Sequence, residues 1–228
     1  MLGTIGCSQT NKTPSSDEAK KADPMQYFMN KVNTTNDMVI CLGNGSLNYA
    51  TVYYYKKIDG RWEKQWETPS RIGRNGFSVH TYEGDVTTPE GTFNLGVAFG
   101  NKPNPGTALE WFDIQDYHYW VDEPESDYFN QLIDGRKITT GWNSAEHLID
   151  FVASYDYCIN IEVNPSCRKD TVSAIFLHCF NLEQGTTAGC VSIGEEYMVK
   201  ILQSIRPGAR MCIARDYNTL YSFIGEQY

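Results

Sequence analysis

Short apolar runs separated by turn-forming residues fill most of the chain after residue 36. The runs MVICLG at Met38–Gly43, GTFNLGVAF at Gly91–Phe99 and YCINIEV at Tyr157–Val163 have the length and the apolar content of strands. Two further β-rich stretches flank the dipeptide Asp59-Gly60, which favours a tight hairpin turn. This pattern predicts a domain built mainly from strands.

Helical periodicity is confined to two segments. In SAEHLIDFVA, Ser144–Ala153, the apolar residues fall on one face of a helix and its first serine can act as the N-cap. In GEEYMVKILQSI, Gly194–Ile205, the apolar residues again recur at helical spacing, and two glutamates occupy the first turn, where the helix dipole stabilises them. The segment RPGARMCIA, Arg206–Ala214, ends this helix and begins a last strand. Together these elements indicate an α+β fold that is predominantly β.

The N-terminal residues differ in composition from the rest of the chain. Up to about Pro24 they are rich in Ser, Thr, Asn, Lys and Asp without periodicity, so we expect residues 1–35 to be a flexible arm and residues 36–228 to be one domain. The segment MLGTIGCSQ, Met1–Gln9, places Cys7 behind a small residue, as at the end of a lipoprotein signal, but lacks the charged and long apolar parts of one. Two interpretations stay open: Cys7 carries a lipid anchor, or the likeness is chance. No apolar stretch is long enough to predict a transmembrane helix.

Charge and cysteine content narrow the classes of function. The formal net charge is -9 without any extended Lys/Arg cluster, which argues against a nucleic-acid partner because phosphate binding needs basic surface. No C-x-x-C pair occurs among the cysteines, so we expect no structural zinc site. We also expect no other metal and no cofactor. Cys158 and Cys167 are close enough in sequence for a disulfide, but sequence alone does not establish one. The odd number of cysteines leaves at least one thiol unpaired in an exported protein.

One stretch combines a histidine and a cysteine in a pattern that suits nucleophilic catalysis. In SAIFLHCFNLEQGTTAGCVSI, Ser173–Ile193, an apolar strand ends at His178, and a polar loop leads to Cys190 behind a glycine. Glycine permits a tight turn, backbone N–H groups there can bind an oxyanion, and an imidazole can take the proton of a thiol. We therefore expect Cys190 to be the nucleophile and His178 its base. Cys179 follows His178 on the strand and should point to the opposite face.

The same stretch resembles a known family. IFLHCF followed by TTAGCVSI is similar to the signature of the L,D-transpeptidases, the YkuD-like cysteine enzymes of bacterial cell-wall synthesis, in which a strand-end histidine is followed by Ser/Thr-x-Gly-Cys-aliphatic, here Thr187–Val191. A second hallmark of that family, TP-x-G-x-F, is present at Thr88–Phe93. The surrounding SRIGRNGFSVHTYEGDV, the pair Gly141-Trp142 and YDYCINIEVN also match one branch of it. The resemblance runs from about Met38 to Ala214.

This resemblance implies a β-sandwich-like catalytic domain that uses peptidoglycan stem peptides as donor and acceptor. The thiolate of Cys190 would attack an amide on the carboxyl side of an L-configured centre, D-alanine would leave, and an amine of a second stem would resolve the thioester into a cross-link. Hydrolysis of the same thioester would instead make the protein an L,D-carboxypeptidase. The resemblance also implies a place in the periplasm or cell envelope and covalent inhibition by carbapenem-type β-lactams.

Further site residues are expected around the pair. The backbone N–H of Cys190, with that of Ala188 or Gly189, would form the oxyanion hole, and a backbone carbonyl between Cys179 and Asn181 would orient His178. Many members of the family carry an arginine where this chain has Ser192. The cations that could replace it are Arg71, Arg74, Arg136 and Lys137. The residues expected to contact substrate or to support the pair are Ser173, Thr187, Ser192, Arg71 and Trp142.

Other classes of function also fit parts of the sequence. A non-catalytic protein that binds cell-wall peptides would not need both His178 and Cys190, and an acidic, lipid-anchored structural protein of the envelope would not need the TPEGTF segment. From the two residues alone, a small buried cysteine and a structural histidine stay open as alternatives. The acidic and aromatic segment Asp113–Phe129 is expected to be a long loop, which in such an enzyme could cap the cleft.

Overall fold

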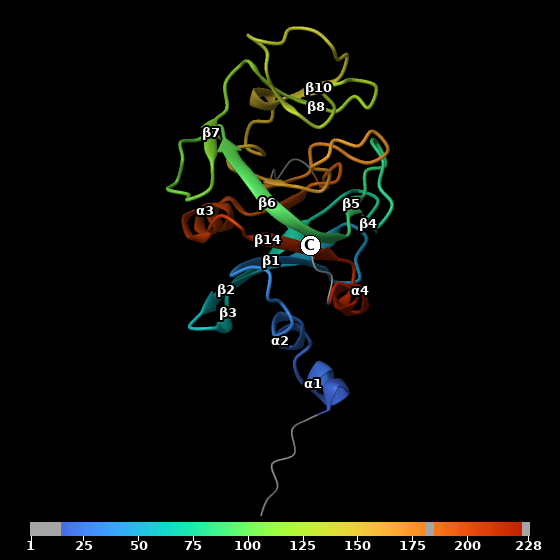
Figure 1. Cartoon of the computed structure of the whole chain (residues 1–228), viewed down its shortest axis with the longest axis vertical. Helices are drawn as coiled ribbons and strands as arrows, with labels where there is room; N and C mark the ends of the chain where they lie inside the picture. The colour runs from blue at the N-terminus through green and yellow to red at the C-terminus, as the bar shows by residue number, and fades with distance from the viewer. Residues whose placement is uncertain (1–14, 181–184, 225–228) are drawn as a thin grey trace, which may run out of the picture.

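A single large sheet forms the centre of the molecule (Figure 1). The structure is a computed structural model and describes residues 15–180 and 185–224. The strands follow one another across the sheet in the order β11 (Cys158–Ile161), β12 (Phe176–Cys179), β13 (Val191–Ile193), β3 (Arg61–Arg71), β2 (Tyr49–Ile58), β1 (Asp37–Gly43), β14 (Arg210–Ala214), β6 (Gly91–Gly100) and β7 (Trp111–Asp113). Because β11 also pairs with β6, the sheet closes on itself into a barrel-like, roughly sandwich-shaped core. The expected α+β, predominantly β fold is confirmed.

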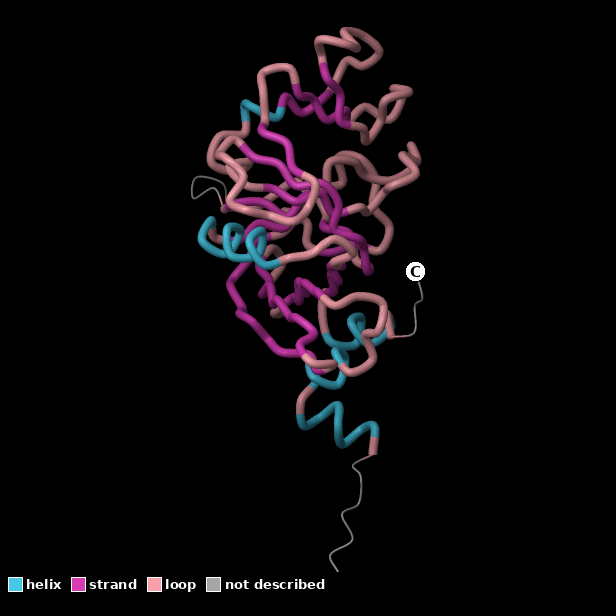
Figure 2. The backbone as a smooth tube through the Cα atoms, turned by 60° about the vertical axis from the view of Figure 1, so that its left-hand side comes forward, coloured by secondary structure: helices cyan, strands magenta, loops and turns pink. Residues whose placement is uncertain are grey.

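Two small sheets and a few short helices complete the fold. The elements outside the large sheet are β10 (Ala145–His147), β8 (His118–Val121) and β9 (Leu132–Asp134) in one sheet, β4 (Phe77–Ser78) and β5 (Thr88–Pro89) in another, the α-helices α1 (Ser16–Ala22), α2 (Pro24–Met29), α3 (Glu195–Ser204) and α4 (Tyr217–Ser222), and the 3-10 helix η1 (Leu148–Asp150). The sheet of β8, β9 and β10 and its long loops lie at one end of the molecule, and α1 lies at the other (Figures 1 and 2).

The large sheet buries both faces of its central strands. On β1, Val39 and Cys41 belong to the main core beneath α3, whereas Met38, Ile40 and Leu42 belong to a second core that α2 and α4 cover. Successive side chains of a strand point to opposite faces, so a strand covered on both sides needs apolar residues at every position. This explains why MVICL reads as an unbroken apolar run.

Several expected elements are confirmed. The hairpin lies at Asp59-Gly60, where both residues have positive φ, 48° and 78°, and Ile58 pairs with Arg61. Positive φ at both positions is the geometry of the turn that suits the twist of paired strands. The helix expected at Gly194–Ile205 is α3, with Met198, Ile201 and Leu202 buried. The last strand is β14.

The α-helix expected at Ser144–Ala153 is wrong. Ala145–His147 form the edge strand β10, paired with β8, and only Leu148–Asp150 are helical, as the 3-10 turn η1. The prediction of a long loop at Asp113–Phe129 is also wrong, because this segment contains the strand β8. Each segment supplies the pairing partner that the other needs, and pairing between distant segments overrides the local periodicity of a short stretch.

Two short helices lie in the described part of the N-terminal segment. Helix α1 begins with a capping box between Ser15 and Glu18 and buries none of its residues. Helix α2 begins at Pro24 and buries Met25, Phe28 and Met29 in the second core. Residues 1–14 of the expected arm, Cys7 included, lie outside the described residues. No helix in the described part of the chain is long and apolar enough to cross a membrane.

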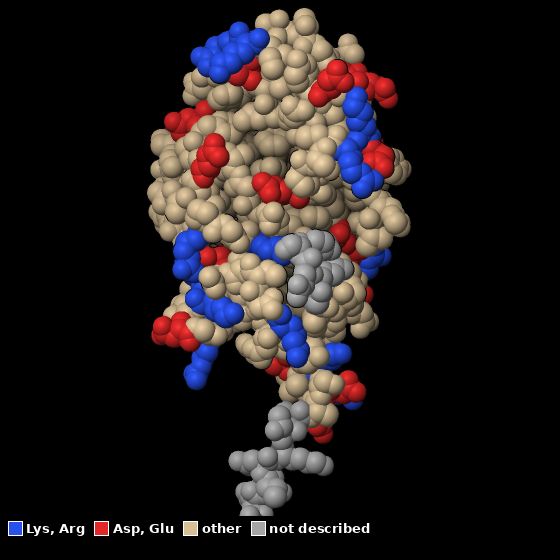
Figure 3. Space-filling view, in the orientation of Figure 1, with Lys and Arg blue, Asp and Glu red and all other residues tan. Residues whose placement is uncertain are grey.

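Basic and acidic side chains are mixed on the face seen in Figure 3. Lys and Arg lie there in small groups with Asp and Glu beside them.

The described cysteines, Cys158 and Cys167 among them, are free thiols, so the fold uses no disulfide between these two residues.

Candidate active site

His178 and Cys190 line the same pocket, although a loop separates them in the sequence. His178 lies near the end of β12, and Cys190 directly precedes β13, the parallel neighbour of β12. The pocket has an empty volume of about 860 Å³, part of it open to solvent. Its lining consists of Arg74, Glu146, Phe151, Ser154, Tyr155, His178, Gly185, Thr186, Thr187, Ala188 and Cys190. The two residues singled out for catalysis are therefore brought together by strand pairing.

The Cys190 thiol is held by the backbone of the strand beside it. The Phe176 N–H donates to Sγ at 3.3 Å, and the S–H donates to the Ala174 carbonyl at 3.3 Å. Ala174 has the left-handed φ of 51°, a conformation that turns its carbonyl and is uncommon for a residue with a side chain. Burial raises the pKa of the Cys190 thiol, and the Glu146 carboxylate raises it further. The thiol is thus protonated at rest and needs a base to react.

His178 is oriented by a backbone carbonyl, as expected. Its Nδ1 lies 2.8 Å from the Cys179 carbonyl oxygen, and because a carbonyl only accepts, Nδ1 carries the hydrogen and Nε2 keeps a lone pair. Burial lowers the pKa of His178 to about 4, against the opposing hydrogen bonds to the backbone of Cys179 and Ser154. The imidazole is therefore neutral near pH 7 and has the form that a base requires. Asn181, the other end of the expected range, lies outside the described residues.

The turn before Cys190 requires glycine. Gly189 has φ of +153°, and a Cβ there would lie 2.9 Å from both the Ile175 Cδ1 and the Thr87 carbonyl oxygen. The Thr187 hydroxyl lies inside the same turn, where it accepts from the Gly189 N–H at 3.2 Å and donates to the Cys190 carbonyl at 2.6 Å. A larger residue at position 189 would displace the cysteine.

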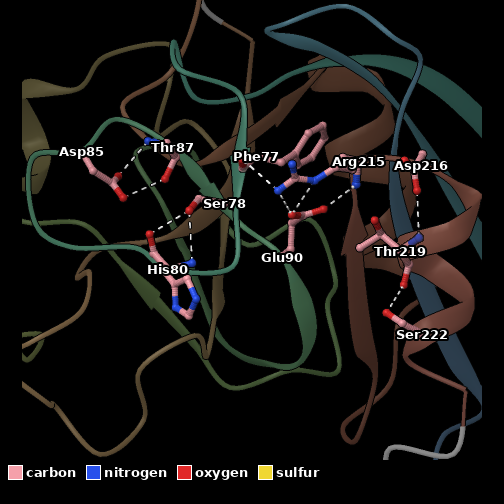
Figure 4. Close-up of polar contacts among 10 residues, drawn as sticks. All are labelled: Phe77, Ser78, His80, Asp85, Thr87, Glu90, Arg215, Asp216, Thr219 and Ser222. Carbon is pink, nitrogen blue, oxygen red and sulfur yellow. Dashed lines mark hydrogen bonds and ion pairs between the residues drawn. The ribbon is translucent and has the colours of Figure 1, made fainter.

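The TP-x-G-x-F segment supports this turn from behind. The Thr88 hydroxyl, fully buried, donates to the Gly189 carbonyl at 2.8 Å and accepts from the Gly73 N–H at 2.8 Å. Two residues further, the buried Glu90 carboxylate binds the guanidinium of Arg215 and accepts from the Arg215 backbone N–H at 2.8 Å (Figure 4). The segment thus connects the end of β14 to the turn that presents Cys190.

Two backbone donors near Cys190 are available for an oxyanion. The Gly189 N–H is occupied by the Thr187 hydroxyl. Among the described residues, the Ala188 N–H has no hydrogen-bond acceptor, and the Cys190 N–H faces only the thiol of its own residue. Of the donors expected for an oxyanion hole, Cys190 and Ala188 are therefore the pair that remains, and both residues line the pocket.

The other expected site residues divide between the pocket and its surroundings. Ser192 is buried on β13, between His178 and Arg71 in the pairing of the strands. Ser173 holds Glu83, whose carboxylate accepts from its N–H at 2.9 Å and its hydroxyl at 2.8 Å. Trp142 packs against Tyr119 and Tyr128 in the small-sheet region, away from the pocket lining.

Of the four cations considered as substitutes for the missing arginine, Arg74 alone lines the pocket. Arg71 donates to the Gly185 carbonyl at 2.7 Å and its guanidinium lies 4.5 Å from the Phe180 ring centre, so it supports Gly185 at the pocket wall without lining the pocket itself. Arg136 and Lys137 both lie near Asp134 in the small-sheet region. Arg74 is exposed and can meet the anionic end of a ligand.

The sequence did not point to Glu146 or Tyr155, which are among the residues that line the pocket. The Tyr155 hydroxyl donates to Glu146 Oε2 at 2.6 Å, and the Tyr155 ring meets the His178 ring edge-on at 5.6 Å between centres. Burial raises the pKa of Glu146 to about 7, against the hydrogen bond from Tyr155. On the expected helix, Glu146 would lie on the polar face and be exposed to solvent, so nothing in the sequence was a reason to choose it. Only the pairing of β10 with β8 reveals that it enters the pocket.

The fold and the pocket define a β-rich domain that presents a cysteine and a histidine at the ends of neighbouring strands. The family model of the L,D-transpeptidase catalytic domain, YkuD, matches residues 31–213. The chain belongs to this family. The matched range contains the closed sheet, His178 and Cys190. No curated protein sequence matches the chain.

The solved structures that match the chain are distant in sequence. Bd1075 of Bdellovibrio bacteriovorus is 14% identical, with 79% of this chain and 48% of that chain covered and a TM-score of 0.44. L,D-transpeptidase 1 of Mycobacterium tuberculosis is 14% identical, with 78% and 62% covered and a TM-score of 0.34. L,D-transpeptidase 3 of the same organism, solved in complex with a faropenem-derived adduct, is 12% identical, with 78% and 60% covered and a TM-score of 0.36. The matches span about half to three fifths of the length of these chains.

Proposed function

We propose that the protein is a cysteine-dependent acyltransferase that acts on peptidoglycan stem peptides through a thioester on Cys190. The observation that carries this proposal is the shared pocket of His178 and Cys190 in a chain of the YkuD family. The neutral state of both groups supports it as well, because a buried thiol with a neutral imidazole beside it can transfer its proton when a substrate excludes water.

The reaction begins with transfer of the Cys190 proton to His178 Nε2. The thiolate attacks the carbonyl carbon of the amide that precedes the terminal D-alanine, and the N–H groups of Cys190 and Ala188 bind the oxyanion. The imidazolium of His178 then protonates the leaving amine, so that D-alanine departs and the thioester remains. Arg74, at the rim of the pocket, binds the carboxylate of the departing residue.

An amine or water completes the reaction. Attack by an amine of a second stem peptide gives a cross-link, and attack by water gives the product of an L,D-carboxypeptidase. Both outcomes use the same thioester and the same two residues. This function places the protein in the cell envelope, where its substrate is, and makes carbapenem-type β-lactams its covalent inhibitors. Lipid attachment at Cys7 would be compatible with that location.

Mass spectrometry of the intact protein after incubation with a carbapenem tests the proposal. We expect one adduct on the wild type, none on Cys190→Ala, and an adduct on the matched control Cys179→Ala. Cys179 is suited as the control because its S–H donates to the Tyr157 carbonyl at 3.7 Å and its side chain lies in the main core. Circular dichroism verifies that the variants are folded.

Two results would contradict the proposal. Loss of the adduct in folded Cys179→Ala would show that the assignment of Cys190 as the nucleophile is wrong. A wild type that binds stem peptides but gains no adduct at high carbapenem concentration would indicate a non-catalytic cell-wall binding protein. Digestion of peptidoglycan treated with the protein, followed by analysis of the muropeptides, then separates cross-linking from hydrolysis.

A further inference from the structure

Glu146 brings a carboxyl group into the pocket that holds Cys190 and His178. Strand β10 fixes its position through pairing of Glu146 with Trp120 on β8. The Tyr155 hydroxyl fixes its orientation by donating to Oε2 at 2.6 Å. The other oxygen, Oε1, has no hydrogen-bond donor among the described residues. One oxygen of the carboxylate is therefore anchored, and the other is left for a ligand.

No cation in the described part of the chain forms an ion pair with Glu146. Burial raises the pKa of Glu146, and the carboxylates of Asp122 and Glu83 raise it further because they repel its negative charge. The Asp122 Oδ1 is itself buried without a hydrogen-bond partner. Burying an unneutralised carboxylate is costly, and a protein usually neutralises it with a cation or a proton. The site is thus suited to a positively charged ligand.

We propose that Glu146 binds the amino group of the acyl acceptor and selects amines over water for the second half of the reaction. This inference rests on the proposed function, because it concerns the fate of the thioester on Cys190. An aliphatic amine is an ammonium ion at neutral pH, with a pKa of about 10. Such a group can donate to Glu146 Oε1 while it approaches the thioester.

The same carboxylate can make the amine reactive. The ammonium passes one proton to Glu146, and the freed nitrogen lone pair attacks the thioester carbonyl carbon. When the tetrahedral intermediate collapses, the C–S bond breaks, and the second proton of the nitrogen passes through His178 to the departing Sγ. The products are an amide, a neutral thiol and a protonated Glu146, which then loses its proton to water. Charge and protons balance without any further reactant.

The experiment measures how the thioester partitions between an amine and water. The wild type, Glu146→Gln and Glu125→Gln are acylated with a stem tetrapeptide, and the ratio of amide to hydrolysis product is determined with N-α-acetyl-lysine as the cationic acceptor and hydroxylamine as the neutral one. Glu146→Gln keeps an acceptor for the Tyr155 hydroxyl and removes the charge. Glu125 is exposed on the same small-sheet region and is absent from the pocket lining, so its variant is the matched control.

We expect Glu146→Gln to lower the amide-to-hydrolysis ratio at least about tenfold with the lysine derivative, as loss of one buried charge pair predicts. The ratio with hydroxylamine should change little, and Glu125→Gln should behave as wild type with both. Glu146→Asp keeps the charge but shortens the side chain by one methylene. Its amide-to-hydrolysis ratio with the lysine derivative should therefore lie between those of the wild type and Glu146→Gln. This variant serves as the second test where Glu146→Gln fails to fold.

Three results are told apart by this design. An unchanged lysine ratio in Glu146→Gln, or an equal fall with both acceptors, overturns the inference and leaves the proposed function intact. A wild type that is acylated but accepts neither amine also overturns it and assigns the protein to hydrolysis. A wild type that forms no acyl-enzyme overturns the proposed function, and the inference falls with it.

Discussion

Burial keeps both Cys190 and His178 uncharged, and this decides how the pair must work. Burial lowers the pKa of His178 to about 4 and raises the pKa of the Cys190 thiol, so each shift opposes formation of a thiolate–imidazolium pair at rest. The thiolate of Cys190 then forms only when a substrate fills the pocket and the N–H groups near Cys190 can bind the oxyanion that develops. Such a site reacts slowly with small reagents and faster with a substrate that fits.

The depressed pKa of His178 has a consequence for stability that can be measured. The ordinary pKa is 6.5 and the folded value is about 4, so the unfolded state takes up a proton at a pH where the folded state does not. The contribution to stability is present above pH 6.5 and is lost as the pH falls toward 4. Its size is roughly 3 kcal/mol, because each unit of pKa is worth about 1.4 kcal/mol.

We therefore expect the free energy of unfolding of the wild type to fall more steeply between pH 6.5 and 4 than that of His178→Gln. Urea titrations at several pH values measure both. Glu146 has a raised pKa, so its contribution runs the other way and is lost as the pH rises toward 7, but it is present in both proteins and cancels in their difference. Parallel pH curves for the two proteins would show that His178 is not buried as described.

At the scale of elements, the segment from β5 to β6 acts as a brace between β14 and the turn of Cys190. One of its ties is the ion pair of Glu90 with Arg215, in which the Glu90 side chain is wholly buried and the Arg215 side chain is half exposed. Removing one partner of a buried pair leaves a charge without compensation, whereas removing both can be nearly neutral.

Arg215→Ala should therefore lower the free energy of unfolding by about 3 kcal/mol. The double variant Glu90→Gln, Arg215→Ala should recover part of that loss, since it leaves no buried carboxylate. Thermal or urea unfolding of the two proteins and the wild type gives the comparison. An Arg215→Ala protein as stable as the wild type would indicate that water reaches Glu90 and replaces the guanidinium.

The elements also show which features sequence can predict. The apolar run of β1, the hairpin at Asp59-Gly60 and the periodicity of α3 are local patterns, and each is confirmed. Ser144–Ala153 also has a local pattern, but β8 captures its first half as a strand, and that partner lies elsewhere in the sequence. The placement of His178 and Cys190 in one pocket followed from a recognisable signature, whereas Glu146 depends on the β8–β10 pairing and on contact with Tyr155, which no local pattern encodes.

At the scale of the molecule, the packed unit includes part of the segment before the first strand. Helix α2 buries Met25, Phe28 and Met29 against the face of the sheet that α4 also covers, whereas α1 buries no residue. The Asp23 side chain accepts from the Gln26 N–H at 2.9 Å and caps α2, so the unit that folds should begin near Asp23.

We expect removal of residues 1–22 to leave the melting temperature nearly unchanged, and Met29→Ala in the full chain to lower the free energy of unfolding by about 2–5 kcal/mol. Met29 is fully buried, so its truncation leaves a cavity. Differential scanning calorimetry compares both proteins with the wild type. A large loss on removal of residues 1–22 would instead show that the contacts of Lys20 with the Tyr27 and Tyr221 rings hold the end of the chain in place.

The parallel pairing of β1 with β14 also governs when the molecule can fold. Met38 pairs with Arg210 and Leu42 with Ala214, so the first strand along the sequence pairs with one from near the end of the sequence. Contacts between segments so far apart slow folding, because a long loop must close before they form. Until the residues around position 210 have been synthesised, β1 can pair with β2 but not with β14, and the second core is uncovered. Closure of the barrel is therefore a late event, and the turn that carries Cys190 is braced through Arg215 only after almost the whole chain has been delivered.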